Sequence, residues 1–324
     1  MLDVYLPMMR TAGILAAGQL GLFARLARGP RSAAQLARAI GADPHGIERL
    51  ADLLVAAGYL RRTARGYANT AHVRRWFADE GRVDYGAGLA WTRHAWHLVE
   101  DLGGAIARGG PQRSLWRRMR DRPELGEHFA AYMRAFAAHA GPVLRRHVVL
   151  PRGANRLLDI GGSHGLHAIA FCRQHPQLHA VVFDHAVSLR ATPQHVREAG
   201  LGDRITTRAG DCVRDDLGTG FDVVLYFSVA HNQSAADNQK VLRKCARALR
   251  PGGLLVVHDY VRGVVPEPYG AAFDLTLLLE VGHRTQTLDM FREQVQRAGF
   301  IGFRHVRLAP AAMGSVMTAR KPRV

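Results

Sequence analysis

Arg156-Leu157-Leu158-Asp159-Ile160-Gly161-Gly162-Ser163-His164-Gly165 is the stretch that decides the fold of this chain. An apolar run typical of a buried strand ends here in an acid and a glycine-rich turn, and a helix-like segment, 166–174, follows. A second apolar run, 180–183, ends in Asp184. This order is typical of an open parallel sheet that binds an adenosine-containing cofactor. We expect Asp184 to accept hydrogen bonds from both ribose hydroxyls.

The spacing of the glycines differs between sites for two kinds of cofactor. A dinucleotide site usually has the pattern G-x-G-x-x-G, so that a helix N-terminus meets the pyrophosphate. Here Gly161-Gly162-x-x-Gly165 follows Asp159 directly. This resembles the D-x-G-x-G-x-G turn of class I methyltransferases that use S-adenosylmethionine, with Ser163 in place of the middle glycine. An ordinary strand-to-helix turn remains the alternative for so short a motif.

The rest of the second half continues the alternation of strands and helices. It predicts an α/β fold: a Rossmann-like, doubly wound, mostly parallel seven-stranded sheet with a C-terminal antiparallel hairpin. A helix predicted to reach Val149 leads into the first strand, and Pro251-Gly252-Gly253 is expected to stop a later helix. The further predicted elements are strands at 205–208, 221–227 and 254–257, helices at 237–249 and 288–298, and a hairpin from 303–308 and 315–319.

The first third of the chain is predicted to be helical and to form a separate domain. The expected pieces are a helix over 32–40 with Ser32 as N-cap, a helix over 44–57 with apolar residues at helical spacing, and a hairpin from 59–62 and 66–69. Helix, turn, helix and hairpin together are a winged-helix pattern. Gly109-Gly110-Pro111 breaks the helical region that follows. We therefore place a winged-helix domain at 1–110 and the sheet domain at 111–324.

The charge of the chain is strongly positive. Lysine and arginine number 44 against 27 acids, so the formal net charge is +17, and nearly all of the positive charge is arginine. Nucleic acid is the obvious partner to consider. However, the arginines are scattered through most predicted helices, and arginine in place of lysine also fits a GC-rich genome. We expect a solvated basic surface and no nucleic-acid partner.

The sequence also argues against a membrane protein and against a disulfide-bonded protein. No uninterrupted apolar run is long enough to cross a bilayer. Segment 11–23 loosely imitates a signal peptide, but Gln19 interrupts it and no convincing cleavage site follows. We expect a cytoplasmic protein with no membrane partner. The three cysteines, Cys172, Cys212 and Cys245, are few, odd in number and widely spaced, which predicts thiols rather than disulfides or a zinc cluster.

The order of the motifs is more specific than any one of them. Segment 159–165 is followed by Asp184, Gly210-Asp211, His231 just past a strand, and Arg250-Pro251-Gly252-Gly253 before a strand that ends in an acid. This order resembles the bacterial and plant small-molecule O-methyltransferases that use S-adenosylmethionine and carry an N-terminal winged-helix dimerisation domain. The resemblance covers nearly the whole chain. It implies a homodimer formed through the N-terminal domain.

The resemblance also implies a cofactor site in 111–324 for S-adenosylmethionine, with S-adenosylhomocysteine as product. Asp159 and Gly161 would line the methionine end, Asp184 would hold the ribose, and Asp211 with Cys212 would border the adenine. The full predicted set is Asp159, Gly161, Gly162, Ser163, Gly165, Asp184, Gly210, Asp211, Cys212, Phe227 and Ser228.

Three residues are predicted to be catalytic. By resemblance, His231 is the base, Asp259 is the acid that orients it, and His283 falls where plant members carry a second glutamate. The base is followed by Asn232-Gln233, where the family usually has Asp-Trp. A phenol with a pKa of about 10 is mostly protonated at neutral pH, whereas a histidine near about 6.5 can accept its proton. No metal is needed for this chemistry. A structural histidine and a turn-capping Asp259 are the alternatives.

The leading functional hypothesis is methyl transfer to a hydroxyl of a small aromatic or polyketide-like metabolite. Transfer to carbon or nitrogen is a close variant, which Asn232-Gln233 makes worth keeping. A DNA-binding regulator that uses the winged helix is a second class of function. A protein that binds S-adenosylmethionine without transferring methyl groups is a third.

Overall fold

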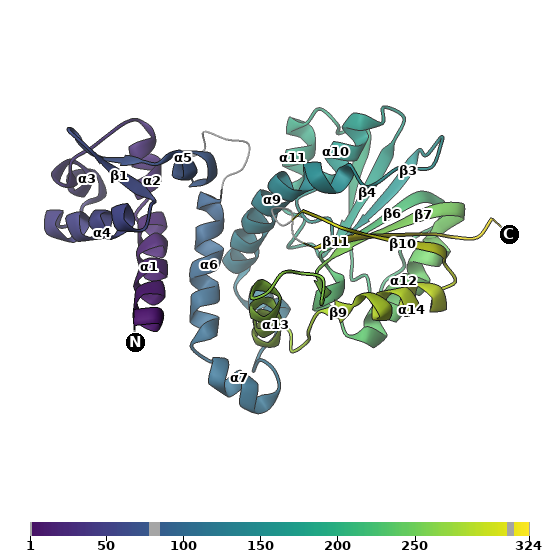
Figure 1. Ribbon diagram of the computed structural model, residues 1–324. Helices are drawn as coiled ribbons and strands as arrows, with labels where there is room; N and C mark the ends of the chain where they lie inside the picture. Colours follow the sequence, from purple (N-terminus) through teal and green to yellow (C-terminus); the bar gives the residue numbers. More distant parts are fainter. Residues whose placement is uncertain (1, 78–84, 310–313, 324) are drawn as a thin grey trace. The chain divides into compact units, whose positions relative to one another are not determined.

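The computed structural model describes residues 2–77, 85–309 and 314–323 (Figure 1). The chain forms two compact units. The N-terminal unit consists of Met1–His97 and Ala131–His139, and the sheet unit consists of Leu98–Ala130 and Ala140–Val324. The two units thus divide between His97 and Leu98, and the boundary predicted at residue 110 stays a prediction.

The N-terminal unit is helical with one hairpin, in the order that the sequence predicts. The Ser32 hydroxyl accepts a hydrogen bond from the Gln35 backbone at 3.2 Å, and the Gln35 side chain accepts one from the Ser32 backbone at 2.9 Å. This capping box fixes the start of the first predicted helix. The elements are α1 (Leu2–Gln19), α2 (Leu22–Ala27), α3 (Ala33–Ile40), α4 (Pro44–Ala56), β1 (Leu60–Thr63), β2 (Gly66–Asn69), α5 (Ala71–Phe77) and α6 (Gly86–Val99).

A seven-stranded sheet forms the centre of the sheet unit, as predicted, with strand order β10-β11-β7-β6-β3-β4-β5. The sheet is parallel except for β11, which runs antiparallel to both of its neighbours. Strand order reverses between β3 and β6, and in open α/β sheets such a switch point opens a ligand crevice. The strands are β3 (Arg156–Ile160), β4 (His179–Asp184), β5 (Ile205–Ala209), β6 (Phe221–Phe227), β7 (Leu249–Asp259), β10 (Ile301–Arg307) and β11 (Ser315–Arg320).

Helices cover both faces of this sheet. In Figure 1, α10 and α11 lie on one face, and α12 and α14 lie on the other. A short parallel pair, β8 (Val261–Arg262) with β9 (Gln286–Thr287), stands apart from the main sheet. The helices are α7 (Leu102–Arg108), α8 (Leu115–Asp121), α9 (Pro123–Arg145), α10 (Leu166–Gln174), α11 (Thr192–Glu198), η1 (Ala230–Asn232), α12 (Ala235–Ala248), α13 (Tyr269–Glu280) and α14 (Leu288–Arg297).

Two predicted boundaries were wrong. The helix expected to reach Val149 ends at Arg145. Strand β7 begins at Leu249, so Pro251-Gly252-Gly253 lie inside it rather than before it. Leu249 already pairs with Phe221, and the register shifts between Phe221 and Val223, so this part of the strand passes through an irregularity. A proline and glycines are tolerated at such places because the regular ladder is interrupted there.

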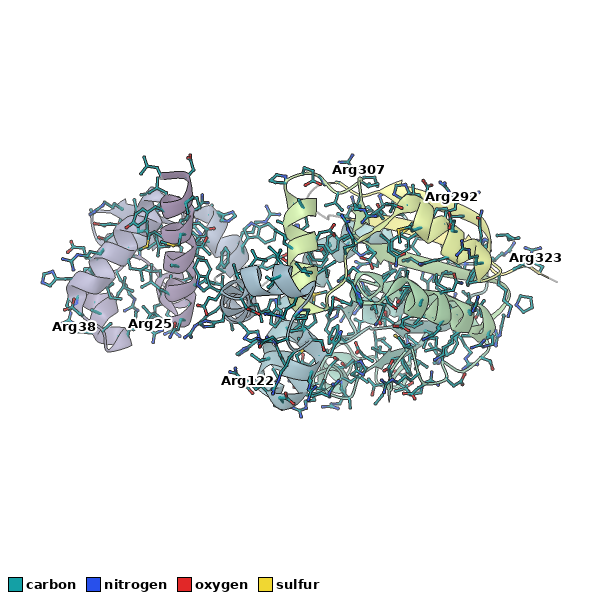
Figure 2. All side chains as sticks on the ribbon, turned by 90° about the horizontal axis from the view of Figure 1, so that it is seen from below. Arg25, Arg38, Arg122, Arg292, Arg307 and Arg323 are labelled. Carbon is teal, nitrogen blue, oxygen red and sulfur yellow. The ribbon has the colours of Figure 1, made fainter. Side chains whose placement is uncertain are left out.

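Arginine side chains are spread over both units. Exposed ion pairs such as Arg62–Asp52 and Arg297–Glu293 each contribute at most about 1 kcal/mol, because solvent screens them. In the described part of the chain, no helix has both the length and the apolarity that a bilayer crossing requires. Figure 2 labels arginines from separate elements of both units: Arg25, Arg38, Arg122, Arg292, Arg307 and Arg323.

Candidate active site

The carboxyl ends of the central parallel strands meet at one edge of the sheet. Ile160 of β3 lies beside Phe183 of β4 and Tyr226 of β6, and Phe227 lies beside His258 of β7. The turns that follow these strands are therefore brought together. This edge carries the glycine turn, Asp184, His231 and Asp259, which are far apart in the sequence.

The glycine turn approaches its neighbours too closely for side chains. Gly161 has a φ of 70°, and a Cβ there would lie 2.2 Å from a methyl group of Val229. A Cβ on Gly162 would lie 2.7 Å from the Asp159 carboxylate and from Val182. A side chain at either position would displace these neighbours, which explains why both residues are glycine.

Ser163, which replaces the middle glycine, adopts a left-handed backbone with a φ of 34°. Its N–H donates to the Asp184 carboxylate at 3.0 Å, and its carbonyl accepts a hydrogen bond from the Thr192 hydroxyl. These bonds hold a conformation that costs a non-glycine residue about 1–3 kcal/mol.

We expect Ser163→Gly to raise the free energy of unfolding by about 1 kcal/mol, because glycine adopts this backbone without a Cβ penalty. Urea unfolding measures the change. Ser163→Ala is the matched control, since it removes the same hydroxyl and keeps the strain. Equal stabilities of the two variants would contradict the explanation.

Asp159 is a buried carboxylate without a partner. The residue is 0% exposed, and neither carboxylate oxygen has a hydrogen-bond partner among the described residues. Burial, together with the charge of Asp184, raises the pKa of Asp159 to about 7, although the nearby Ala168 backbone N–H opposes the rise. A buried carboxylate of this kind favours a bound cation. The ammonium group of S-adenosylmethionine is such a cation, so the residues at this turn fit that cofactor.

Asp184 holds the glycine turn and its own loop. One carboxylate oxygen accepts the Ser163 N–H, and the other accepts the His185 N–H at 2.7 Å. Burial raises the pKa of Asp184, and these hydrogen bonds oppose the rise. Each carboxylate oxygen has two lone pairs, so both can still accept hydrogen bonds from ribose hydroxyls.

The remaining predicted cofactor residues lie at the ends of β5 and β6. Gly210 packs against the Phe183 ring, where a Cβ would lie 2.5 Å from a ring carbon. The Asp211 carboxylate accepts the Val213 N–H at 2.8 Å and thereby shapes its own turn. Burial raises the pKa of the neighbouring Cys212 thiol to about 12.

Phe227 and Ser228 differ in what they offer a ligand. The Phe227 ring lies edge-on to His167, with ring centroids 5.0 Å apart, and is 5% exposed, so it belongs to the core. Ser228 has a φ of 55°, and its hydroxyl lies 3.5 Å from Nδ1 of His258. Their roles in cofactor binding stay predictions.

His231 and Asp259 form a buried pair at the same edge of the sheet. His231 lies in the short helix η1 directly after β6, and Asp259 is the last residue of β7. Nδ1 of His231 is 2.7 Å from Oδ1 of Asp259, and the His231 backbone N–H donates to Oδ2 at 3.1 Å. An ionised carboxylate can only accept, so Nδ1 carries the proton, and in the neutral ring Nε2 then has a free lone pair. A histidine in this state can act as a base.

Aromatic rings and a buried amide surround this pair. The Phe273 ring centroid is 5.2 Å from that of His231, and the Tyr260 centroid is 5.8 Å away. Asn238 donates to the Ala230 carbonyl at 2.8 Å and accepts from the Tyr226 hydroxyl at 2.7 Å. These buried bonds fix the turn that carries His231.

Glu280 is a residue of this site that the motif search did not identify. It is 8% exposed, burial raises its pKa to about 7, and its interaction with His231 opposes the rise. Phe273, Leu277 and Glu280 share one face of α13, because they are four and seven positions apart. The available signal was an acid directly after the apolar run 277–279.

His283 lies elsewhere. It belongs to the loop after α13 and lines a cavity together with Ser234 and Gln286. In the described part of the chain it makes no hydrogen bond to His231 or Asp259. A catalytic role of His283 stays a prediction, and the structure brings Glu280 toward His231 instead.

Comparison with known families defines the class of this fold and site. Residues 104–301 match the O-methyltransferase domain, and residues 4–79 match the O-methyltransferase dimerisation domain. The chain belongs to the O-methyltransferase family. It is an S-adenosylmethionine-dependent O-methyltransferase that carries an N-terminal dimerisation domain.

Individual relatives span nearly the same length. The chain is 29% identical to 3-hydroxy-5-methyl-1-naphthoate 3-O-methyltransferase of Streptomyces sahachiroi, over 97% of this chain and 93% of that protein. It is 27% identical to phenazine-1-carboxylate N-methyltransferase of Pseudomonas aeruginosa, over 95% and 92% of the two chains. Human N-acetylserotonin methyltransferase, solved in complex with S-adenosylmethionine, has the same fold, with a TM-score of 0.89, 22% identity and coverage of 99% and 96%.

Proposed function

We propose that the enzyme transfers the methyl group of S-adenosylmethionine to a hydroxyl of a small aromatic or polyketide-like metabolite, with His231 as general base. The observation that carries this proposal is the 2.7 Å contact between Nδ1 of His231 and the buried Asp259 carboxylate. It leaves Nε2 as the acceptor of the hydroxyl proton. The relative that acts on a hydroxynaphthoate supports the substrate class.

The glycine turn and two acids would hold the cofactor. Asp159 would face its ammonium group, Asp184 would accept from its ribose hydroxyls, and Asp211 with Cys212 would border its adenine. When bound, S-adenosylmethionine supplies a methyl group activated by its sulfonium. The backbone of Gly161 and Gly162 fixes the position of the cofactor, and alignment of the two reactants is the main source of catalysis in such a transfer.

His231 and its partners would handle the proton. As the acceptor oxygen would form its bond to the methyl carbon, the bond from that carbon to the cofactor sulfur would break and leave its electron pair on the sulfur. Nε2 of His231 would take the hydroxyl proton. Asp259 holds the ring in the required tautomer and stabilises the imidazolium that forms. Glu280 adds a second acid, whose charge when ionised favours the same imidazolium.

A planar acceptor fits the walls near His231. Phe273 is stacked on Tyr269 with an angle of 9° between the rings, and its centroid is 4.4 Å from that of Tyr260. Aromatic side chains favour offset stacking and edge contacts with other rings. These side chains therefore support an aromatic acceptor.

The test is product analysis with purified protein. We expect S-adenosylmethionine and a hydroxylated naphthoate to yield S-adenosylhomocysteine and an O-methyl ether, identified by mass spectrometry and the methyl proton chemical shift. Phenazine-1-carboxylate, which has ring nitrogens and no phenolic hydroxyl, is assayed in parallel, and an N-methylated product would favour the N-methyl alternative that the phenazine relative suggests. Cofactor binding without any S-adenosylhomocysteine, over a panel of phenols, would favour the non-transferring alternative.

We also propose that the enzyme is a homodimer through its N-terminal domain. The match to a dimerisation domain supports this. Helix α1 exposes a row of apolar side chains, with Leu2 67%, Val4 74% and Leu6 55% exposed. Large apolar residues gathered on one exposed segment are typical of protein contacts. If the N-terminal domain serves dimerisation, it is less favoured as a DNA-binding domain.

A further inference from the structure

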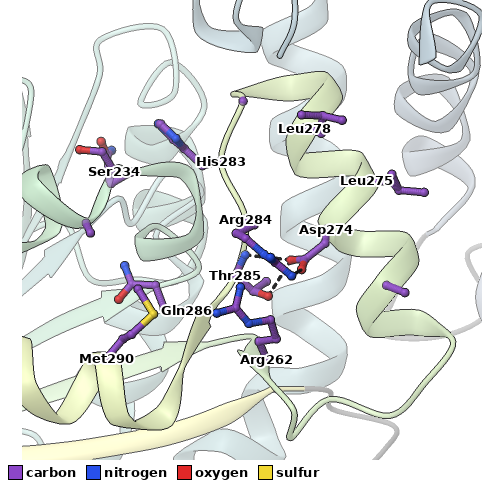
Figure 3. A pocket seen from close by; sticks show the side chains of 14 residues that line it. Ser234, Arg262, Asp274, Leu275, Leu278, His283, Arg284, Thr285, Gln286 and Met290 are labelled. Carbon is purple, nitrogen blue, oxygen red and sulfur yellow. Dashed lines mark hydrogen bonds and ion pairs between the residues drawn. The ribbon is translucent and has the colours of Figure 1, made fainter. Parts of the chain in front are cut away.

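The cavity that His283 lines lies against the face of α13 that is turned away from Phe273. The Phe273 ring contacts His231 and Glu280 interacts with it, whereas Ala271, Asp274 and Leu278 line this cavity. The two sets of residues are on opposite sides of one helix. The cavity has a volume of about 900 Å³, within the range of about 300–1,000 Å³ that small-molecule sites occupy. Figure 3 shows it between α13 and the side chains of Ser234 and Met290.

Gln286 is the first sign that this cavity takes a ligand. The residue lines the cavity and is 4% exposed, and neither its amide nitrogen nor its amide oxygen has a hydrogen-bond partner among the described residues. An unsatisfied buried polar group costs about 1–3 kcal/mol. The side chain can turn its terminal amide with little torsional cost, so a polar ligand in the cavity would satisfy it.

The charges around the cavity favour an anion. Arg262 lines it and forms no ion pair within residues 2–77, 85–309 and 314–323. The opposing acid, Asp274, is already engaged, because it accepts from Thr285 at 2.8 and 2.6 Å and from Arg284 at 3.2 Å. The other nearby acid, Asp237, is bound to Lys240 at 2.8 Å and to the Ser234 hydroxyl.

A helix terminus and apolar walls complete the site. Ser234 and Ala235, at the N-terminus of the 14-residue helix α12, line the cavity. The helix dipole adds partial positive charge there. Leu275, Leu278 and Met290 supply apolar surface. The ligand that matches this lining has one negative group and an apolar body.

We propose that the cavity behind α13 is a second ligand site, which binds a small organic carboxylate with an apolar body. The carboxylate faces Arg262 and the α12 N-terminus, the Gln286 amide hydrogen-bonds to it, and the apolar body lies against Leu278 and Met290. His231 is not among the residues that line this cavity, and Phe273, which contacts His231, lies on the other face of α13. The proposal therefore does not depend on the methyl acceptor or on His231 being the base.

The first test needs no ligand. If the Gln286 amide has no partner in the free protein, Gln286→Leu leaves the melting temperature unchanged or raises it. Thr285→Val is the control on the adjacent residue, because it removes a hydroxyl that is bonded to Asp274, and it should lower the melting temperature. A fall for Gln286→Leu as large as that for Thr285→Val would overturn the premise of an unpartnered amide.

The second test measures binding by calorimetry with 1-naphthoate and octanoate, neither of which has a hydroxyl to methylate. We expect at least one to bind the protein saturated with S-adenosylhomocysteine. Arg262→Gln and Gln286→Leu should each lower the affinity for that carboxylate at least 10-fold. The rate of methyl transfer measured without the carboxylate should stay unchanged in both variants. The neutral isostere 1-naphthalenemethanol should bind at least 10-fold more weakly.

Phe273→Ala distinguishes the two sites. Binding that this variant abolishes, and that Arg262→Gln leaves intact, would locate the probe at the acceptor site and overturn the proposal. Failure of both carboxylates to bind below 1 mM, roughly the weak limit for a specific small-molecule site, would also overturn it. Neither result bears on whether the enzyme transfers methyl groups.

Discussion

Replacement of His231 by glutamine is expected to lower kcat for methyl transfer by about 10²–10⁴-fold, the usual contribution of a positioned general base. Glutamine retains a polar group of similar reach but cannot accept the proton. The dissociation constant of S-adenosylmethionine should change little, because the cofactor contacts lie in the glycine turn. Single-turnover kinetics with labelled cofactor, combined with calorimetry, separates the chemical step from binding.

The matched control is the other predicted histidine. His283→Gln removes an imidazole of the same kind from a different cavity, and its effect on kcat should be less than about 10-fold, well below that of a lost base. Asp259→Asn should lower kcat strongly as well, since an amide that donates to Nδ1 would favour the wrong tautomer. Full activity of His231→Gln on a phenolic acceptor would rule out the assignment of the base.

Replacement of Asp159 by asparagine is expected to have two effects of opposite sign. Burial holds the pKa of Asp159 at about 7, above its ordinary value, so the folded protein resists ionisation of this group. The stability that this proton confers is complete below the unfolded pKa near 4 and is lost as the pH rises through about 7. At pH 8, Asp159→Asn should therefore raise the free energy of unfolding by on the order of 2–4 kcal/mol.

Cofactor binding should change in the other direction. The charged carboxylate is the group that would face the cofactor ammonium, and a hydrogen bond between charged groups contributes about 1.5–3 kcal/mol. We expect Asp159→Asn to weaken S-adenosylmethionine about 10- to 100-fold, the equivalent of that energy. The wild-type affinity should fall as the pH drops below about 7, and the affinity of the variant should not.

Asp184→Asn is the matched comparison, because Asp184 is a half-buried acid at the same edge that already accepts two backbone N–H bonds. Its replacement should lower both stability and affinity. Urea unfolding and calorimetry at pH 6 and pH 8 measure all three proteins. A destabilised Asp159→Asn variant with unchanged cofactor affinity would show that Asp159 has a hidden structural partner and does not face the cofactor.

Much of the fold and of the cofactor site follows from local sequence. Strand β6, 221–227, was predicted to the residue, because a fully buried parallel strand is a continuous apolar run between breakers. The glycine turn was visible in the sequence but left an ordinary strand-to-helix turn open as the alternative. The structure supplies the steric reason for glycine at 161 and 162, where a Cβ would lie within 2.7 Å of neighbouring side chains. The start of β7 was missed. Proline and glycine usually interrupt a strand, but here they lie where the register with β6 is irregular, and that pairing is not visible in the local sequence.

The catalytic and ligand-binding chemistry depends on contacts between residues distant in sequence. The sequence by itself determined the order of strands, turns and helices and therefore the sheet edge at which His231 and Asp259 meet. Only the tertiary structure decided that Asp159 lacks a partner, that Glu280 rather than His283 turns toward His231, and that Gln286 lies unpaired behind α13. The physical reason is that burial, hydrogen-bond partners and the facing of a helix are set by packing between elements, which no local pattern of residues records.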